Sequence, residues 1–392
     1  MKANPGGYIP SAEVVGRDSL IQKIGRSLER QSVVLTAERR MGKTSIVKKM
    51  ADEVQAGKLP IYRDLEGIKT PVDFVQVVFR DVEGYLSRQR VTAGRTRKFL
   101  SELSGLEIGG FGTSIKIPEI AAPHWKELLS KTIEDLGENQ QQIIIFFWDE
   151  LPLMLYDIKR ASGEDLAMEL LDTLRALRQS HSQLRMVFTG SIGLHHVLHS
   201  LKRSGYANDP TNDMDVVEVP PLAEADAKGL AQRLIDGEGI QTDDVSRLAQ
   251  SIAEIVDGMP YFIHLVVDNL VEKGGAASID AVEEIVTTAL TDPQDRWYLS
   301  HYTGRVNQYY TVEEQPFALA LLDALASIQQ SLPFAALFNL LKSRLVTEDD
   351  ERARNVLSLL QRDHYVAKKI DGTFCFRFPL IQRSWRLQRG LA

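Results

Sequence analysis

The first half of the chain alternates between short apolar runs and longer amphipathic segments. Each apolar run is rich in β-branched or aromatic residues and is followed by polar residues, which predicts a buried strand. These runs span residues 32–37, 59–65, 142–148 and 184–189. Segments with helical spacing of apolar residues lie at 43–55, 71–86, 91–102, 125–136 and 164–179. Strands that alternate with helices indicate an α/β fold with a parallel sheet.

The pattern becomes helical after Pro220 and Pro221, where we place a domain boundary. Four helices are predicted at residues 223–235, 245–256, 262–272 and 279–288. A polar and aromatic stretch at residues 302–310 marks a second boundary. After it we predict helices at 313–328, 334–341 and 351–361, strands at 365–369 and 373–377, and a final helix. Asp371 and Gly372 fit a hairpin turn between the two strands, so this order predicts a winged helix-turn-helix.

One glycine-rich stretch interrupts the alternating half. Residues 105–117 alternate around paired glycines, which predicts a hairpin within an insertion at about 88–122. Several basic residues precede it. Two interpretations stay open at this point: a surface that contacts protein or DNA, or a decoration at the edge of the sheet.

The composition is that of an ordinary globular protein, with 44% hydrophobic and 25% charged residues among 392. Lys and Arg number 46 and Asp and Glu 53, so the net charge of −7 excludes a uniformly basic nucleic-acid-binding surface. The single cysteine, Cys375, excludes an intrachain disulfide and a cysteine-based zinc site, and it suits a reducing cytoplasm. The chain has no apolar run of membrane-spanning length and no secretory signal. We therefore expect a cytoplasmic protein that does not enter a membrane.

The strongest chemical signal is the segment AERRMGKT at residues 37–44, between the first predicted strand and a helix. It matches the phosphate-binding pattern G-x-x-x-x-G-K-[ST] except at Ala37, where the pattern has glycine. Gly42 allows the backbone N–H groups to approach phosphate oxygens, and the helix N-terminus adds a favourable dipole. Lys43 is expected to hold the β- and γ-phosphates, and the Thr44 hydroxyl to bind Mg²⁺. The predicted nucleotide-binding residues of this segment are Ala37, Arg39, Arg40, Met41, Gly42, Lys43, Thr44 and Ser45.

An acidic pair follows the third predicted strand. Asp149 and Glu150 end the apolar run, as in a Walker B element. A carboxylate at this place would lie beside the phosphate loop, so Asp149 is expected to bind Mg²⁺ with Thr44. Glu150 is placed to orient or polarise the attacking water. The alternative is an acidic pair at a helix N-terminus, where negative charge is favourable.

The fourth predicted strand ends in small polar residues. Ser191, or Thr189, is predicted to contact the γ-phosphate as a sensor, and an N-cap at Ser191 is the alternative. Arg203 fits either an arginine finger that reaches a neighbouring subunit's nucleotide or a solvated loop charge. We thus predict a catalytic set of Lys43, Asp149, Glu150 and Ser191.

Together, these elements resemble the STAND branch of AAA+-related P-loop ATPases. More narrowly, they are similar to archaeal-type ATPases with the layout of origin-recognition initiators. The resemblance rests on Val15-Gly16-Arg17-Asp18, Arg39-Arg40-x-Gly42-Lys43-Thr44-Ser45, Asp149-Glu150, Thr189-Gly190-Ser191 and Gly258-Met259-Pro260-Tyr261. It implies three domains: a nucleotide-binding domain at 1–221, a helical lid at 222–304 and a winged helix at 305–392.

The resemblance also implies roles outside the phosphate loop. Val15, Gly16 and Arg17 would lie near the adenine, and Pro260 would begin a lid helix over the nucleotide. The lid helix often carries an arginine at this position in AAA+ proteins, but none lies near Pro260 here. His264 would be either a substitute phosphate contact or a core or surface histidine. The missing arginine favours slow hydrolysis or tight retention of ATP or ADP.

The C-terminal segment is basic. From Arg352 onward it has nine basic and two acidic residues, a net charge of +7. Lys368 and Lys369 fall on the predicted wing, where phosphate contacts are made. The segment would bind duplex DNA, or it would lie as a clamp on the acidic ATPase body or a protein partner.

The sequence therefore predicts an ATP-binding, slowly hydrolysing molecular switch that regulates a partner protein or effector chain. The alternative is a DNA-binding, initiator- or transposition-like AAA+ ATPase. Family resemblance implies a prokaryotic defence or mobile-element setting. An ATP-dependent homo-oligomer is a further expectation. The sequence shows no second catalytic pattern beside the ATPase motifs.

Overall fold

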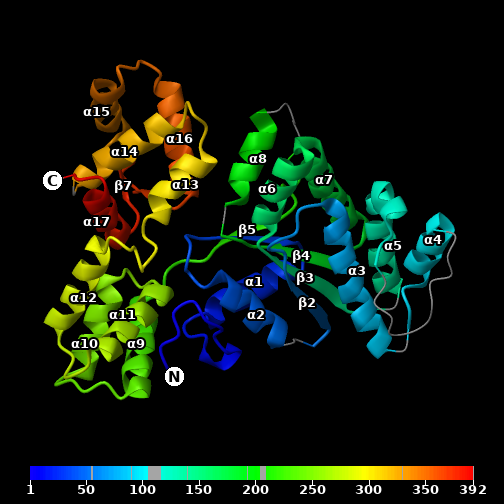
Figure 1. Cartoon of the computed structure of the whole chain (residues 1–392), viewed down its shortest axis with the longest axis horizontal. Coiled ribbons are helices and arrows are strands. Elements are labelled where there is room, and N and C mark those ends of the chain that lie inside the picture. The colour runs from blue at the N-terminus through cyan, green and yellow to red at the C-terminus, as the bar shows by residue number, and fades with distance from the viewer. Residues whose placement is uncertain are drawn as a thin grey trace. The chain divides into compact units, whose positions relative to one another are not determined.

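The computed structural model describes residues 1–53, 56–89, 91–104, 116–138, 140–191, 193–203, 209–328 and 330–391, and only the backbone at 202 and 203. The chain forms two compact units (Figure 1). The sheet unit comprises Ser19–Thr36 and Lys43–Glu218, and the C-terminal unit comprises Met1–Asp18, Ala37–Gly42 and Val219–Ala392. The predicted domain limits at residues 221 and 304 stay predictions. Among the described residues, every helix is too short or too polar to cross a bilayer.

The sheet unit is built on five parallel strands in the order β2-β3-β4-β1-β5. Their bounds are β1 Val33–Thr36, β2 Lys58–Asp64, β3 Ile143–Asp149, β4 Leu184–Phe188 and β5 Asp215–Glu218. The predicted parallel sheet is thus confirmed, and the first four strands lie where the apolar runs predicted them. The pattern did not predict β5, a short edge strand with acidic ends and an exposed Val216.

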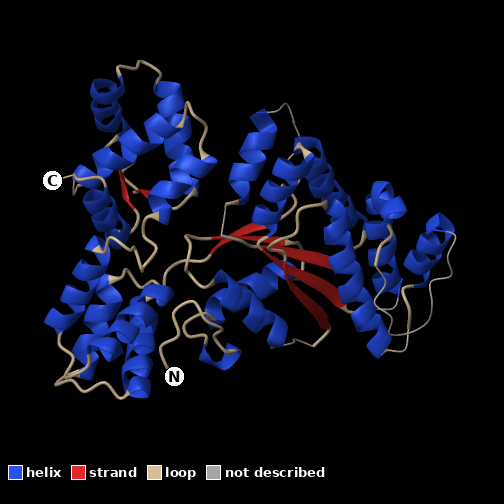
Figure 2. Ribbon diagram, viewed as in Figure 1, coloured by secondary structure: helices blue, strands red, loops and turns tan. Residues whose placement is uncertain are grey.

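Helices cover both faces of this sheet (Figure 2). They are α1 Asp18–Leu28, α2 Lys43–Asp52, α3 Pro71–Arg88, α4 Gly94–Ser104, α5 Trp125–Glu138, α6 Leu151–Ser162, α7 Glu164–Ser180 and α8 Leu194–Arg203, with short 3-10 turns at Ser11–Glu13 and Glu119–His124. The pattern did not predict α6 and α8. Alternate residues of β3 face opposite sides, since Phe146 and Trp148 pack in the core with α3 and α7, whereas Ile145 and Phe147 face α1 and α2.

The predicted hairpin at residues 105–117 falls mostly on 105–115, which lie outside the described residues. Two of the basic residues before it form ion pairs within the sheet unit. Arg97 pairs with Glu83 at 2.6 Å, and Arg95 pairs with Glu134 at 3.1 Å. These two ion pairs connect α4 to α3 and α5.

The C-terminal unit is helical, as predicted. Its elements are α9 Glu224–Glu238, α10 Val245–Ile255, α11 Pro260–Lys273, α12 Ile279–Thr291, α13 His301–Tyr309, α14 Gln315–Ser327, α15 Phe334–Leu345, α16 Asp350–Arg362, β6 Val366–Lys368, β7 Phe374–Phe376 and α17 Pro379–Gln388. The stretch at residues 302–310, taken as a boundary, mostly forms α13 and buries Tyr302 and Val306. The antiparallel pair β6–β7 follows three helices, in the element order predicted for a winged helix.

The C-terminal segment presents less positive charge than its numbers of basic and acidic residues suggest. Arg352 pairs with Asp349 at 3.2 Å, and Arg389 binds Asp323 at 2.9 Å. Both acids lie before the counted stretch, so the net charge of +7 overstates the positive charge that this segment presents.

Candidate nucleotide-binding site

The predicted magnesium ligands lie together at the carboxyl end of β3. Asp149 is the last residue of β3, and Thr44 lies in the first turn of α2. The Thr44 hydroxyl donates a hydrogen bond to Asp149 Oδ2 at 2.6 Å. Burial raises the pKa of Asp149, and the bond from Thr44 and the charge of Lys43 oppose that rise. Lys43 is itself buried, near both Asp149 and Glu150.

This pair of groups fits Mg²⁺. Mg²⁺ prefers oxygen ligands, keeps several waters and is usually held by one or two carboxylates together with substrate phosphates. A hydroxyl and a carboxylate in direct contact supply such oxygens. Asp149 is only 2% exposed, so a cation would relieve the cost of keeping its charge buried.

Ser191 holds Glu150. Its backbone N–H donates to the Glu150 carboxylate at 2.9 Å and its hydroxyl donates to Oε2 at 2.8 Å. Burial raises the pKa of Glu150, and the two bonds from Ser191 oppose it. Gly190 allows the close approach, because a Cβ there would lie 2.8 Å from Pro152 Cδ and 3.3 Å from Glu150 Cα. Ser191 is therefore placed to orient Glu150.

The other predicted sensor, Thr189, has a free hydroxyl. Thr189 is 1% exposed, and its Oγ1 has no hydrogen-bond partner among the described residues. It follows directly on β4, which lies between β1 and β3 in the sheet. A buried hydroxyl beside the strand that ends in Asp149 suits a contact that forms when a ligand binds.

Tyr62 was missed in the sequence. It lies on β2, which pairs with β3 so that Asp64 is opposite Asp149. The Tyr62 hydroxyl lies 3.5 Å from Asp149 Oδ2, and burial and the nearby carboxylates raise its pKa. The signal that could have revealed it is a polar-tipped residue near the end of the strand beside the acidic pair.

Residues 37–42 of the phosphate loop belong to the C-terminal unit, whereas Lys43 and Thr44 belong to the sheet unit. Arg17 donates to the Met41 carbonyl at 2.9 Å and to the Pro220 carbonyl at 2.8 Å. Arg17 is 4% exposed, and burial lowers its pKa to about 10. Its guanidinium thus supports the loop and the start of the segment that leads to α9. The predicted position of Val15, Gly16 and Arg17 near adenine stays a prediction.

Two glycines give these loops their shape. Gly16 has φ +68, and a Cβ there would lie 2.6 Å from Asp226 Cβ, so the residue needs to be glycine. Gly42 has φ +84 with open space where a Cβ would be. That conformation brings the chain into α2, so that Lys43 and Thr44 open the helix as the motif predicted.

Arg40 is bound by the predicted lid. Its Nη1 donates to the Trp297 carbonyl at 3.0 Å, and its Cζ lies 3.9 Å from the centre of the Tyr261 ring. Pro260 is the first residue of α11, as predicted, and Tyr261 follows it. Arg40 therefore connects the loop to α11 and to the segment after α12.

The remaining predicted residues differ in exposure. Ala37 and Ser45 are half-buried, and Arg39 is exposed with its backbone N–H bound to Glu38 at 2.7 Å. His264 on α11 accepts a hydrogen bond from the Asn4 backbone at 3.1 Å, and burial lowers its pKa to about 4. These contacts identify His264 as a core histidine. The side chain of Arg203 lies outside the described residues.

The chain was compared with known proteins. The Walker-type ATPase of Pyrococcus abyssi has a TM-score of 0.63 and 16% identity, over 95% of this chain and 96% of that one. The ORC2 protein of Aeropyrum pernix in its ADPNP–ADP complexes has a TM-score of 0.56 and 12% identity, over 98% and 96%. Its ADP form has a TM-score of 0.50 and 13% identity, over 99% and 97%.

The chain has the fold of a P-loop ATPase. This confirms the predicted α/β fold and, at the level of fold, the likeness to archaeal-type and origin-recognition ATPases. No family model and no curated protein matches the sequence. The roles of individual residues therefore rest on the geometry above.

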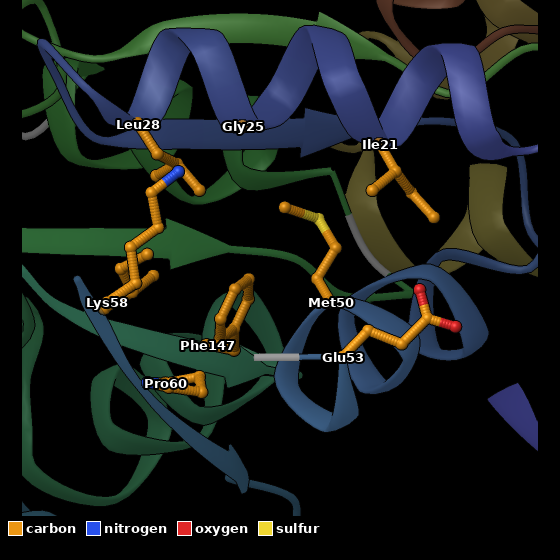
Figure 3. Close-up of a pocket in the computed structure, with 9 residues that line it drawn as sticks. Ile21, Gly25, Leu28, Met50, Glu53, Lys58, Pro60 and Phe147 are labelled. Atoms are coloured by element: carbon orange, nitrogen blue, oxygen red, sulfur yellow. The ribbon is translucent and has the colours of Figure 1, made fainter. Parts of the chain in front are cut away.

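A separate cavity in the sheet unit does not belong to this site. Ile21 and Leu28 of α1, Met50 of α2 and Phe147 of β3 line it (Figure 3). Lys58, the first residue of β2, also lines it, whereas Asp149 is the last residue of β3, at the other end of these two paired strands. Its volume of about 50 Å³ is far below the several hundred Å³ of typical ligand pockets.

Proposed function

We propose that this protein binds ATP with Mg²⁺, hydrolyses it slowly and acts as a nucleotide-operated switch for a partner protein or effector chain. The observation that carries the proposal is the direct contact of Thr44 with Asp149 at the end of β3. The fold of P-loop ATPases supports it. In that fold, residues at these two positions and at the position of Lys43 hold the phosphates and their metal ion.

Each residue has a distinct part in the proposed reaction. Lys43 and the backbone of the loop bind phosphate oxygens, and Thr44 and Asp149 hold Mg²⁺. The bound metal neutralises charge on the phosphates. Glu150, oriented by Ser191, accepts a proton from the attacking water, and its burial keeps the carboxylate basic.

Two observations support slow hydrolysis. The sequence of α11, PYFIHLVVDNLVEK, has no arginine, and His264 is occupied by the Asn4 backbone. Arg40 is bound to the Trp297 carbonyl and the Tyr261 ring. The proposed site therefore has fewer cations for the γ-phosphate than AAA+ proteins with a lid arginine.

The regulatory part of the proposal rests on the contacts of the phosphate loop. Met41 contacts Arg17, Arg40 contacts the predicted lid, and Glu38 contacts α13. All three partners belong to the C-terminal unit. A nucleotide that favours one conformation of the loop would favour one arrangement of these partners.

Nucleotide titration tests the proposal. Wild type should bind a fluorescent ATP analogue in the presence of Mg²⁺ and release phosphate slowly, and Lys43→Ala should weaken binding at least about tenfold. Lys98→Ala is the matched control, because Lys98 lies on α4 with its side chain 79% exposed. Equal affinity in Lys43→Ala and wild type would refute the nucleotide site.

Binding of duplex DNA is the second candidate function. Ile370 at the wing tip is fully exposed and follows Lys368 and Lys369. Side chains of these kinds bind phosphates and base steps. Lys368→Glu with Lys369→Glu should weaken DNA binding and its salt dependence. If wild type shows no DNA binding at low salt, with or without ATP, this candidate is removed.

The ATP-dependent homo-oligomer is a further part of the proposal. Mass measurement in solution with ADP and then with a non-hydrolysable ATP analogue tests it. A single mass under both conditions would contradict it.

A further inference from the structure

Glu38 of the phosphate loop is buried against a helix far along the chain. Its Oε1 accepts a hydrogen bond from Nη1 of Arg305 at 2.6 Å, and the two residues are 267 positions apart. The side chain of Glu38 is 0% exposed and that of Arg305 is 11% exposed. The same Glu38 oxygen accepts the backbone N–H of Arg39 at 2.7 Å, so this carboxylate also fixes the turn of the loop.

Arg305 has a second acidic partner. Its Nη2 lies 3.4 Å from Asp363 Oδ1, and Asp363 directly follows α16. The Tyr310 hydroxyl donates to the other Asp363 oxygen at 2.5 Å. The Arg305 guanidinium also lies 5.3 Å from the centre of the Tyr365 ring. One arginine on α13 thus connects the phosphate loop to the end of α16.

A buried cluster of this composition is sensitive to small changes. Removing one partner of a buried ion pair leaves an uncompensated charge, which is far more costly than removing an exposed pair. The raised pKa of Arg305 in the field of Glu38 and Asp363 agrees with a guanidinium that both carboxylates stabilise. A planar guanidinium offers separate donors to the two carboxylates, which a lysine ammonium does not reproduce.

We propose that Arg305 is a positioning residue of the phosphate loop, which holds Glu38 and so couples the conformation of the loop to the end of α16. The purpose of the coupling rests on the proposed nucleotide function. A nucleotide that shifts the loop would shift Glu38, and Arg305 would pass that change to Asp363. The signal would thus reach the predicted winged helix through one side chain.

Amide hydrogen exchange without nucleotide tests the positioning role. In Glu38→Gln, exchange should become at least about tenfold faster at residues 37–42 and at residues 363–366. Glu284→Gln is the matched control, because Glu284 forms an exposed ion pair with Lys273 in the same unit. Unchanged exchange in either segment of Glu38→Gln would overturn the proposal.

A conservative variant keeps the test decisive if Glu38→Gln does not fold. Arg305→Lys retains the positive charge but lacks the forked donors. We expect amide exchange at residues 37–42 and 363–366 of Arg305→Lys to be several-fold faster than in wild type. It should be slower than in Glu38→Gln, if that variant folds. Wild-type exchange in Arg305→Lys would show that the guanidinium has no positioning role.

Adding ATP or ADP with Mg²⁺ separates this proposal from the proposed function. In wild type the nucleotide should change exchange at both segments, and in Glu38→Gln at residues 37–42 only. If wild type binds no nucleotide, the ATPase function fails, and the exchange without nucleotide still decides the role of Arg305. If nucleotide changes both segments of Glu38→Gln as in wild type, the coupling is overturned and the ATPase function stands.

Discussion

The end of β3 and the phosphate loop are the two regions that the proposed nucleotide site requires, and they are built differently. At the end of β3, the acidic pair contacts Thr44 in the first turn of α2 and Ser191 in the loop that follows β4. In the loop, Glu38 and Arg40 contact Arg305 and Tyr261, which lie more than 200 residues away in the chain.

This difference suggests a division of labour. The end of β3 is fixed by the sheet and holds groups suited to metal binding and proton transfer. The loop is held by side chains from the predicted lid and from α13, so its conformation depends on their arrangement. Variants of the first region should affect chemistry with little effect on stability, and variants of the second should do the reverse.

The largest effect is expected for Glu150→Gln. Loss of the proposed general base should reduce ATP turnover by about 10²–10⁴-fold. Binding of the ATP analogue should remain within about threefold of wild type, because the amide still accepts the bonds from Ser191. Single-turnover phosphate release measures the rate, and Glu134→Gln, at a half-buried position on α5, is the control. Turnover equal to wild type would remove Glu150 from the mechanism.

The next largest effect concerns Arg17. Arg17→Ala leaves the buried Met41 carbonyl and the Pro220 carbonyl without their donor, which should lower the free energy of unfolding by about 2–4 kcal/mol. Urea denaturation measures this effect. Arg26→Ala, near the end of α1, should change the free energy by less than about 0.5 kcal/mol. A similar loss in both variants would contradict the role of Arg17 in supporting the loop.

A pH-dependent effect is expected at Asp257. Burial raises its pKa to about 6, and its carboxylate accepts the Leu380 N–H at 2.8 Å at the start of α17. A raised carboxyl pKa makes the folded state less stable as the pH rises from about 4 through 6. Asp257→Asn removes that titration. Above pH 7 its free energy of unfolding should exceed that of wild type by about 1–3 kcal/mol, and this excess should fall as the pH is lowered toward 4. Thermal unfolding from pH 4 to pH 8 measures it, and a constant difference would contradict it.

The smallest effect is expected for Tyr62→Phe. The hydroxyl lies at the outer limit of a hydrogen bond to Asp149, so its loss should weaken that contact by about 0.5–1 kcal/mol. We expect the Mg²⁺ concentration for half-maximal ATP turnover to change by a factor of about two to five. Tyr156→Phe on α6 is the control. A larger effect than in Glu150→Gln would show that Tyr62 takes part in the chemistry.

The sequence predicted the sheet well because buried parallel strands are apolar along their whole length. It missed β5, which is short and has acidic ends, and it took α13 as a boundary. In α13 the buried Tyr302 and Val306 have helical spacing, but polar residues between them obscure the pattern. Residues 105–115 lie outside the described residues, so the predicted hairpin stays a prediction.

The site was predictable where a local motif defines it. The pattern around Lys43 and the acidic pair after β3 predicted that Thr44 and Asp149 lie close together, as the structure shows. The contacts of Glu38 with Arg305 and of Arg17 with Met41 depend on tertiary packing, which no spacing in the sequence encodes. Ser191 was predicted as a sensor, but its contact with Glu150 required the three-dimensional arrangement of β3 and β4.

The backbone at Glu150 has a further consequence. Its φ of 56° places a residue with a Cβ in the left-handed region, which costs roughly 1–2 kcal/mol. Glycine would adopt the same conformation without that cost but would lack the carboxylate. Under the proposed mechanism, a more stable fold and faster hydrolysis favour different residues at position 150, so the glutamate would be a trade-off between stability and activity.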